Sequence, residues 1–278
     1  MTGFDVLVAV GPDGVHEGAL DLAAAEAGRR GTGVLLLHVV HGAGETQELD
    51  HALTEVGRQV LTAAAGRLEG RVPYTTEIAT GPVAATIAER VAADGLVVLE
   101  RRDVGTMERL LTMSVSTRVA AQAHAPVVVV PAGWTWPLEE QPVTVAVDEP
   151  LRVDAQVEAA LAAARSAKQR LVVLHAVWLA EPYQDIAFGH DTRARWVAEA
   201  ESALAHSLTG LGAEGDVPDD IDVDVQWRRP VDALVRATRS SALLVLGRRP
   251  GHLGVHLGSL TRTVLRHAEG PVMVVDRS

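Results

Sequence analysis

The chain has 278 residues, of which 47% are hydrophobic and 22% are charged, and its formal net charge is −11 at pH 7. Such an acidic chain, with 3% aromatic residues, is not expected to bind nucleic acid, which requires clustered Lys and Arg or aromatic stacking platforms. It contains no cysteine, which excludes disulfides, thiolate metal sites and cysteine nucleophiles. No apolar run is long enough to cross a membrane and no signal peptide precedes the first apolar segment, so the sequence predicts a cytoplasmic protein.

The first half alternates short apolar segments, typical of buried strands, with longer segments of helical periodicity. Leu20, Ala23 and Ala27 fall on one face of the first helical segment, and Gly31 follows it as the expected C-cap. Pro82 is expected in the first turn of a later helix. In chain order we expect strands at 5–10, 34–39, 74–78, 96–99 and 127–130, alternating with helices at 15–30, 48–68, 82–93 and 114–123.

The second half repeats this alternation. Its apolar segments again read as strands buried on both faces, which is typical of a parallel sheet covered by helices. Residues 212–220 read as a loop. We expect strands at 143–147, 171–176, 222–227, 243–246 and 272–275, with helices at 151–167, 192–208, 231–239 and 259–268.

The two halves are copies of one domain. His38 and His175 occupy matching strand ends 137 residues apart, and Ser114 and Ser259 precede matching apolar strands 145 residues apart. A repeat this long indicates two domains rather than a solenoid. The sequence therefore predicts two tandem Rossmann-like doubly wound α/β domains, each with a five-stranded parallel sheet flanked by helices, at 1–133 and 143–278.

A linker is expected at 134–142 between the copies, stiffened by its prolines together with Pro131. The linker begins directly after Gly133 and contains Trp134 and Trp136. Because Trp is usually largely buried, we expect these side chains to pack against a domain surface rather than bind a ligand.

Residues after the strands of the second copy form a candidate nucleotide site, because ligands of open α/β sheets bind beyond the carboxyl ends of strands where strand order reverses. Asp148 follows the first strand and could accept a hydrogen bond from a ribose hydroxyl or an exocyclic amine. Gly247 follows the fourth strand, and Gly258 and Ser259 open the next helix, where glycine backbone and a hydroxyl suit phosphate. From these residues alone, turn glycines and a Ser259 that serves only as an N-cap explain the pattern equally well.

Both copies resemble universal stress protein domains, and the chain resembles a tandem member of that family. The resemblance rests on Val143-Thr-Val-Ala-Val-Asp148, Leu174-His-Ala-Val177, Leu244-Val-Leu-Gly-Arg-Arg249, Leu257-Gly-Ser-Leu260 and Pro271-Val-Met-Val-Val275. ATP-binding members carry G-x2-G-x9-G-(S/T) after the fourth strand and an Asp after the first. The resemblance implies ATP, with Mg²⁺ accompanying it, in the second copy only, at Asp148, Ala176, Gly247, Gly251, Gly258, Ser259 and Leu260.

The second copy departs from the family motif at two points. Pro250 stands at the second glycine, with Gly251 beside it, and the interval from Pro250 to Gly258 is two residues shorter than the motif. Proline has no N–H to donate to a phosphate and its φ is fixed. Phosphate binding would therefore be weakened or shifted to Gly251.

The first copy departs further from the motif. Gly11 replaces the Asp, Glu100 and Asp103 stand at the first two glycines, Met113 stands at the third, and Ser114 remains. Two carboxylates facing a triphosphate repel it. We therefore expect no ATP binding in this copy in the family's manner.

Other polar residues are expected to be structural or solvated. His38 and His175 lack a second metal ligand at suitable spacing and read as partly buried structural residues. Arg248 and Arg249 match Arg101 and Arg102 of the first copy, which favours a structural or interface role. The remaining loop residues read as solvated rather than as phosphate or cation ligands: His252, His256, Asp185, Asp191 and 214–222.

Three functions remain open. The first is a non-catalytic stress-response protein that senses an adenine nucleotide through the second copy. The second is a nucleotide-free interaction scaffold in which both pockets have degenerated. The third is an enzyme, such as a slow ATP hydrolase or a nucleotidyl transferase, but the sequence has no G-x-S-x-G, Walker lysine or H-E-x-x-H motif.

The resemblance also implies the strand order 3-2-1-4-5 in each domain. The last strands, at 127–130 and 272–275, would then be apolar edges, which are normally paired. In the family such edges pair between domains. We therefore expect an antiparallel contact between the two copies within one chain, and chains that form homodimers.

Overall fold

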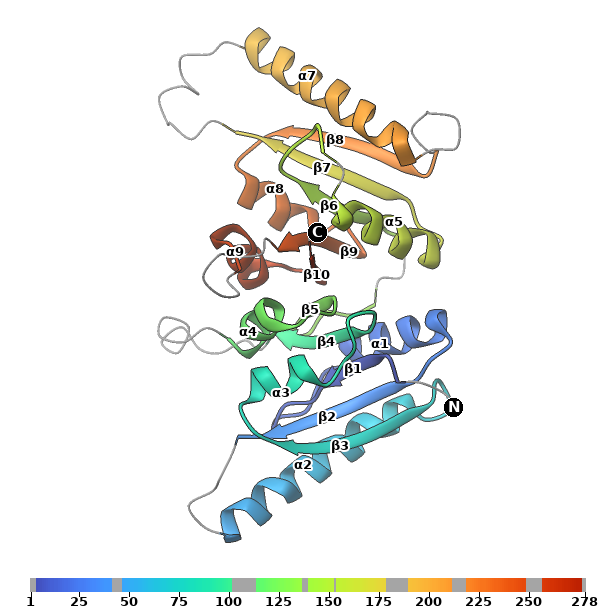
Figure 1. The fold of residues 1–278 in the computed structure, drawn as a ribbon, viewed down its shortest axis with the longest axis vertical. Helices are drawn as coiled ribbons and strands as arrows, with labels where there is room; N and C mark the ends of the chain where they lie inside the picture. Colours follow the sequence, from blue (N-terminus) through green and yellow to red (C-terminus); the bar gives the residue numbers. More distant parts are fainter. Residues whose placement is uncertain are drawn as a thin grey trace. The chain divides into compact units, whose positions relative to one another are not determined.

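A computed structural model describes residues 4–41, 47–101, 114–136, 140–152, 154–178, 190–211, 219–248 and 257–276. It contains two compact units (Figure 1). The first contains Met1–Trp136, and the second contains Pro137–Arg249 and Gly258–Ser278.

The first unit is a parallel sheet in the order β3-β2-β1-β4-β5. Its helices α1 and α2 contact each other, as do α3 and α4, which agrees with right-handed crossovers that place one pair on each face. The bounds are β1 Val6–Ala9, α1 Glu17–Arg30, β2 Val34–Val40, α2 Gln47–Leu68, β3 Tyr74–Thr80, α3 Val83–Glu89, β4 Leu96–Arg101, α4 Val115–Gln122 and β5 Val127–Pro131.

The second unit repeats this topology, with the strand order β8-β7-β6-β9-β10 and every neighbouring pair parallel. The predicted α/β class and the order 3-2-1-4-5 are therefore confirmed in both units. The bounds are β6 Val143–Val147, α5 Ala155–Ala167, β7 Leu171–Val177, α7 His190–Leu208, a 3-10 turn Thr209–Leu211, β8 Ile221–Trp227, α8 Pro230–Ala237, β9 Leu243–Arg248, α9 Ser259–His267 and β10 Val272–Asp276.

Several predicted ends were wrong. α5 begins at Ala155 rather than 151, because Arg152 N–H first closes a turn on Glu149 O (3.1 Å) and Asp154 is the N-cap. α3 ends at Glu89 rather than 93, since Gly95 N–H bonds Ala92 O in the turn that leads to β4. Pro82 is the N-cap of α3 rather than a first-turn residue. Strands β3, β4 and β9 run past their apolar residues, because backbone pairing does not depend on side-chain polarity.

The core of each unit is formed by the strands and by small residues on the covering helices. Leu20, Ala23 and Ala27 of α1 are all buried, as predicted. Gly31 ends α1 in the left-handed conformation, with φ 65°, which a glycine adopts without a Cβ clash.

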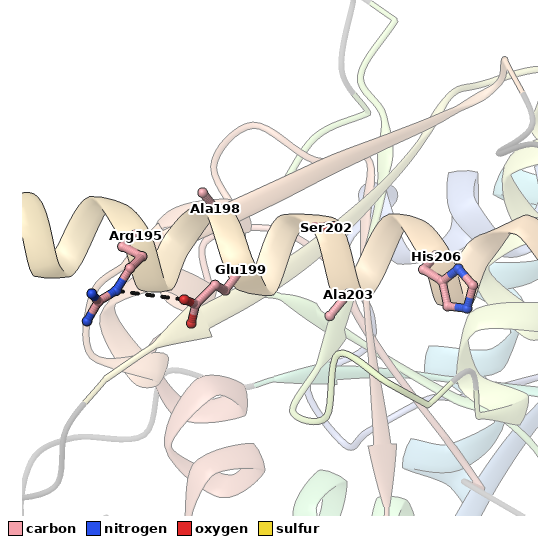
Figure 2. Close-up of a pocket in the computed structure, with 6 residues that line it drawn as sticks. All are labelled: Arg195, Ala198, Glu199, Ser202, Ala203 and His206. Carbon is pink, nitrogen blue, oxygen red and sulfur yellow. Dashed lines mark ion pairs between the residues drawn. The ribbon is translucent and has the colours of Figure 1, made fainter.

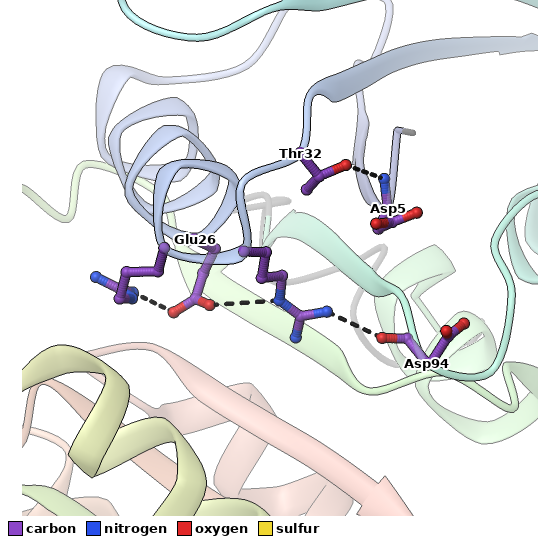
Figure 3. A network of polar contacts seen from close by, with 6 residues as sticks. Asp5, Glu26, Thr32 and Asp94 are labelled. Carbon is purple, nitrogen blue, oxygen red and sulfur yellow. Dashed lines mark hydrogen bonds and ion pairs between the residues drawn. The ribbon is translucent and has the colours of Figure 1, made fainter. Parts of the chain in front are cut away.

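Polar contacts fasten the amino ends of the first sheet (Figure 3). Asp5 N–H donates to Thr32 Oγ1 (3.1 Å), which joins the residue before β1 to the segment before β2. Arg30 at the end of α1 donates to Asp94 O (3.0 Å) in the turn before β4 and also pairs with Glu26 (3.7 Å). This end of the sheet is therefore held by the fold's own groups.

The amino end of β8 in the second unit is fastened by two exposed ion pairs. Arg165 pairs with Asp220 (2.9 Å) and Arg170 with Asp222 (2.5 Å). The hydrogen bond from Arg165 lowers the pKa of Asp220, and that from Arg170 lowers the pKa of Asp222. Exposed pairs of this kind contribute little stability, but they too lie at the amino end, away from the candidate nucleotide site.

Trp134 packs on helix α1, as predicted, whereas the burial expected of Trp136 is wrong. A Cβ added at Gly18 would lie 2.0 Å from Trp134 O and 2.9 Å from its ring, so the glycine makes this contact possible. Trp136 remains 41% exposed and meets Trp134 edge to face, with ring centroids 5.9 Å apart. Among the described residues, no helix is long and apolar enough to span a membrane.

Candidate functional site

The predicted site residues that the structure describes gather at the carboxyl end of the second sheet. Asp148 directly follows β6, Ala176 is the penultimate residue of β7, and Gly247 is the penultimate residue of β9. Because the strands are parallel, these ends share one edge of the sheet. The next helix, α9, begins at the same edge with Ser259 and Leu260. Gly251 and Pro250 lie outside the described residues.

Strands β6 and β9 separate early at this edge. Their pairing extends to Val145↔Val245, whereas β6 and β7 stay paired to Val147↔His175. In the first unit the corresponding strands β1 and β4 pair one residue further, to Ala9↔Leu99. This is the point where strand order reverses, which is where open α/β sheets bind ligands.

Gly258 is the N-cap of α9, so the capping residue of this helix has no side chain to cap it. Its φ of −56° is open to any residue, and among the described residues a Cβ built there would meet no atom within 4 Å. Neither backbone conformation nor packing therefore requires glycine. Ser259 is the first helical residue rather than the N-cap, so the interpretation as a cap alone is wrong.

The corresponding helix of the first unit is capped differently. Ser114 is the N-cap of α4, and its hydroxyl accepts a hydrogen bond from Thr117 N–H (3.3 Å). The hydroxyl that the two copies share therefore already serves the helix itself in the first unit. In the second unit a glycine takes the capping position.

A carboxylate occupies the carboxyl end of the first sheet. Glu100, which matches Gly247, accepts a hydrogen bond from His16 N–H (2.6 Å) and lies 2.5 Å from His16 Nδ1. Its side chain is 10% exposed, and His16 is the N-cap of α1. A built-in negative charge therefore holds the helix N-terminus where an anionic ligand would otherwise be favoured. Sequence reasoning found Glu100 but missed His16, which no motif marks.

The two matching histidines are structural, as predicted. His38 Nδ1 lies 2.9 Å from Val10 O, His175 Nδ1 lies 3.0 Å from Val147 O, and both residues are buried. A carbonyl only accepts, so the Nδ1 atoms carry the protons. Each ring thus ties the end of one strand to its neighbour. In the second unit it fixes the residue immediately before Asp148.

Comparison with known proteins agrees with this geometry. The model of the Universal stress protein family matches residues 5–131 and again residues 140–276. The chain belongs to the universal stress protein family. The two matches account for its repeated topology.

The relatives include complete and partial matches. A universal stress protein of Mycolicibacterium smegmatis is 28% identical over 294 residues, covering 99% of this chain and 97% of the relative. One from Mycobacterium tuberculosis strain CDC 1551 is 32% identical over 125 residues, so the match spans 43% of this chain and less than half, 43%, of that relative. Among solved structures, a universal stress protein from Archaeoglobus fulgidus has a TM-score of 0.68 at 19% identity, covering 98% of this chain and 96% of that one. That likeness shows the shared fold.

Arg248 of this universal stress protein is engaged inside its own sheet. It is 6% exposed, and its Nε and Nη2 atoms donate to the two carboxylate oxygens of Asp276 on the neighbouring strand (2.5 and 3.1 Å). This bidentate pair agrees with the predicted structural role. Arg249 and Arg102 lie outside the described residues, as do Asp103, Met113, Asp185, His252 and His256.

Sequence reasoning missed two groups at this edge of the universal stress protein. Gln156, in the first turn of α5, is 1% exposed and donates from Nε2 to Ala146 O (2.9 Å). Stacked Trp196 and Trp227 have centroids 5.8 Å apart, and Arg229 lies over Trp178 at 5.3 Å. Isolated Gln and Trp residues form no motif, although comparing the two copies would have marked both groups.

A shallow hollow on the exposed face of α7 does not coincide with any of these residues (Figure 2). All of its lining residues come from one helix: Arg195, Ala198, Glu199, Ser202, Ala203 and His206. Within the described ranges, no group of three His, Asp or Glu residues could hold a metal ion.

Proposed function

We propose that this universal stress protein is a non-catalytic cytoplasmic stress-response protein that binds ATP or another adenine nucleotide in its second unit. The observation that carries the proposal is Gly258, an N-cap without a side chain around whose backbone the described residues leave open space. Gly258 lies at the end of the sheet at which the pairing of β6 and β9 stops early. A glycine at the start of a helix allows a ligand to approach the backbone closely.

The nucleotide would lie across the carboxyl edge of the second sheet. Gly247, Gly251, Gly258, Ser259 and Leu260 would surround its phosphates, because a helix N-terminus offers free N–H groups and a positive dipole end. Asp148 and Ala176 would contact the nucleoside. Mg²⁺ would arrive with the phosphates and neutralise part of their charge.

The proposed role is sensing rather than turnover. The assigned side chains supply one carboxylate and one hydroxyl, which suit hydrogen bonding to a nucleotide. The nucleotide would change the conformation or partner affinity of the chain. Pairing between the last strands of the two copies, and dimerisation of chains, stay predictions.

A nucleotide-free scaffold is the second candidate. Pro250 and the shortened interval before Gly258 favour it, because proline removes one N–H from the phosphate loop. The first unit also shows how this fold can close such an edge, with Glu100 bonded to His16. The two candidates differ in whether the second unit binds nucleotide.

Thermal unfolding of the full chain with and without millimolar ATP and Mg²⁺ separates the two candidates. A ligand at about 100 times its dissociation constant stabilises the native state by roughly 2.7 kcal/mol. For domains of this size range, each kcal/mol of stabilisation raises the melting temperature by roughly 2–8 °C. We therefore expect saturating nucleotide to raise the melting temperature by several degrees. An unchanged melting temperature at saturating nucleotide would favour the scaffold.

A further inference from the structure

Gln156 is held rigidly in the second unit. It lies in the first turn of α5, is 1% exposed, and its Nε2 donates to Ala146 O at 2.9 Å. A carbonyl oxygen only accepts hydrogen bonds, so the amide cannot be reversed without losing this contact. The other end of the amide is therefore fixed as an oxygen.

That oxygen, Oε1, is buried and has no hydrogen-bond partner among the residues that the structure describes. A buried amide oxygen without a donor costs free energy, and native structures contain few such groups. The unpaired oxygen therefore requires an explanation. A ligand that donates a hydrogen bond to it would provide one.

The fold itself does not require a glutamine at this place. Each buried residue of α5 corresponds to a buried residue of α1 at a separation of 137, and Gln156 corresponds to Ala19. Ala19 is 1% exposed, so alanine completes the same helix–sheet contact in the first unit. The matched pairs are Ala19 and Gln156, Leu20 and Val157, Ala23 and Ala160, Ala24 and Leu161, and Ala27 and Ala164.

The amide lies where β6 and β9 separate. Pairing of these strands ends at Val145↔Val245, and the next carbonyl, that of Ala146, is the one bonded to Gln156. In the first unit, Ala9 at the corresponding place is still paired with Leu99. The buried polar group is thus found in the copy whose strands part early. The carbonyl to which it donates, that of Ala146, lies two residues before Asp148.

We propose that Gln156 is a specificity-determining residue of the second unit, whose Oε1 accepts a hydrogen bond from an N–H or O–H donor of the bound ligand. The inference rests on the proposed function and names the chemistry that the site reads. For an adenine nucleotide the donors are the exocyclic amine and the ribose hydroxyls. Because Oε1 is covered in the structure, binding must displace the atoms that cover it.

Nucleotides that each lack one donor test this assignment. The full chain is titrated with ATP, with ITP, in which a carbonyl replaces the amine, and with 2′-deoxy-ATP and 3′-deoxy-ATP, each with Mg²⁺. Wild type should bind ATP about tenfold more tightly than at least one of the analogues, the effect of one buried hydrogen bond. In Gln156→Ala that preference should disappear, whereas Gln59→Ala on the exposed face of α2 should keep it.

Alanine at this position is suited to the fold, as Ala19 shows, and Gln156→Leu provides a second variant if the first melts early. The outcomes separate the two proposals. If wild type binds ATP and the preference persists in the folded variant, or if wild type has no preference, the assignment of Gln156 is wrong and the proposed function stands. If wild type binds none of the four nucleotides, the proposed function and this inference both fail.

Discussion

Gly258→Met is expected to abolish nucleotide-dependent stabilisation while leaving the chain folded. The new side chain would enter the space that the described residues leave open at the start of α9, where the proposal places phosphate. The backbone at φ −56° accepts Met without strain, and losing a glycine N-cap costs about 1 kcal/mol or less. In wild type, nucleotide at 100 times its dissociation constant should raise the free energy of unfolding by roughly 2.7 kcal/mol. In Gly258→Met this increase should vanish.

Gly210→Met is the matched control for this experiment. Gly210 lies in the same unit, in the turn after α7, and a Cβ there also meets no atom of the described part of the chain within 4 Å. This variant should keep the full nucleotide response in a thermal melt. A response that survives in Gly258→Met would move the phosphates away from the start of α9.

Replacing His38 or His175 with Leu is expected to lower the free energy of unfolding by about 1–3 kcal/mol at each site. Leucine keeps an apolar side chain of similar size but leaves the buried carbonyl of Val10 or Val147 without its ring donor. The loss would be read from urea unfolding curves. In the second unit the freed Val147 should also weaken nucleotide binding, because it immediately precedes Asp148.

His206→Leu is the control for the histidine variants. His206 is exposed on α7, and a surface change of this kind should alter stability by about 0.5 kcal/mol or less. Equal losses in all three variants would show that the ring–carbonyl contacts contribute nothing particular. A loss confined to the two buried positions would support their role in holding the strand ends.

The fold was largely predictable because its signals are local and repeated. Continuous apolar runs marked the strands, and the segment 143–147 was predicted with its observed bounds. Ends were harder, since ladder pairing carried β9 through Gly247 to Arg248, beyond the apolar run. Helix starts depended on turn hydrogen bonds such as Arg152 N–H to Glu149 O, which composition does not reveal.

The candidate site was predictable only in part. The glycines and Asp148 follow predicted strands, and ligands of open α/β sheets bind at the carboxyl ends of the strands. The sequence alone could therefore place these residues at one end of the sheet. The Glu100–His16 contact joins residues 84 positions apart, and Gln156 is one amide within an alanine-rich helix. Such long-range or single-residue features emerge when the two copies are compared position by position in space.

Calorimetric titration of the full chain with ATP and Mg²⁺ tests the central claim most directly, because it counts sites as well as detecting them. We expect one nucleotide per chain, bound by the second unit, with the first unit closed by Glu100. The same titration of Gly258→Met should show no binding. Two nucleotides per chain, or none, or one that Gly258→Met still binds, would contradict the account.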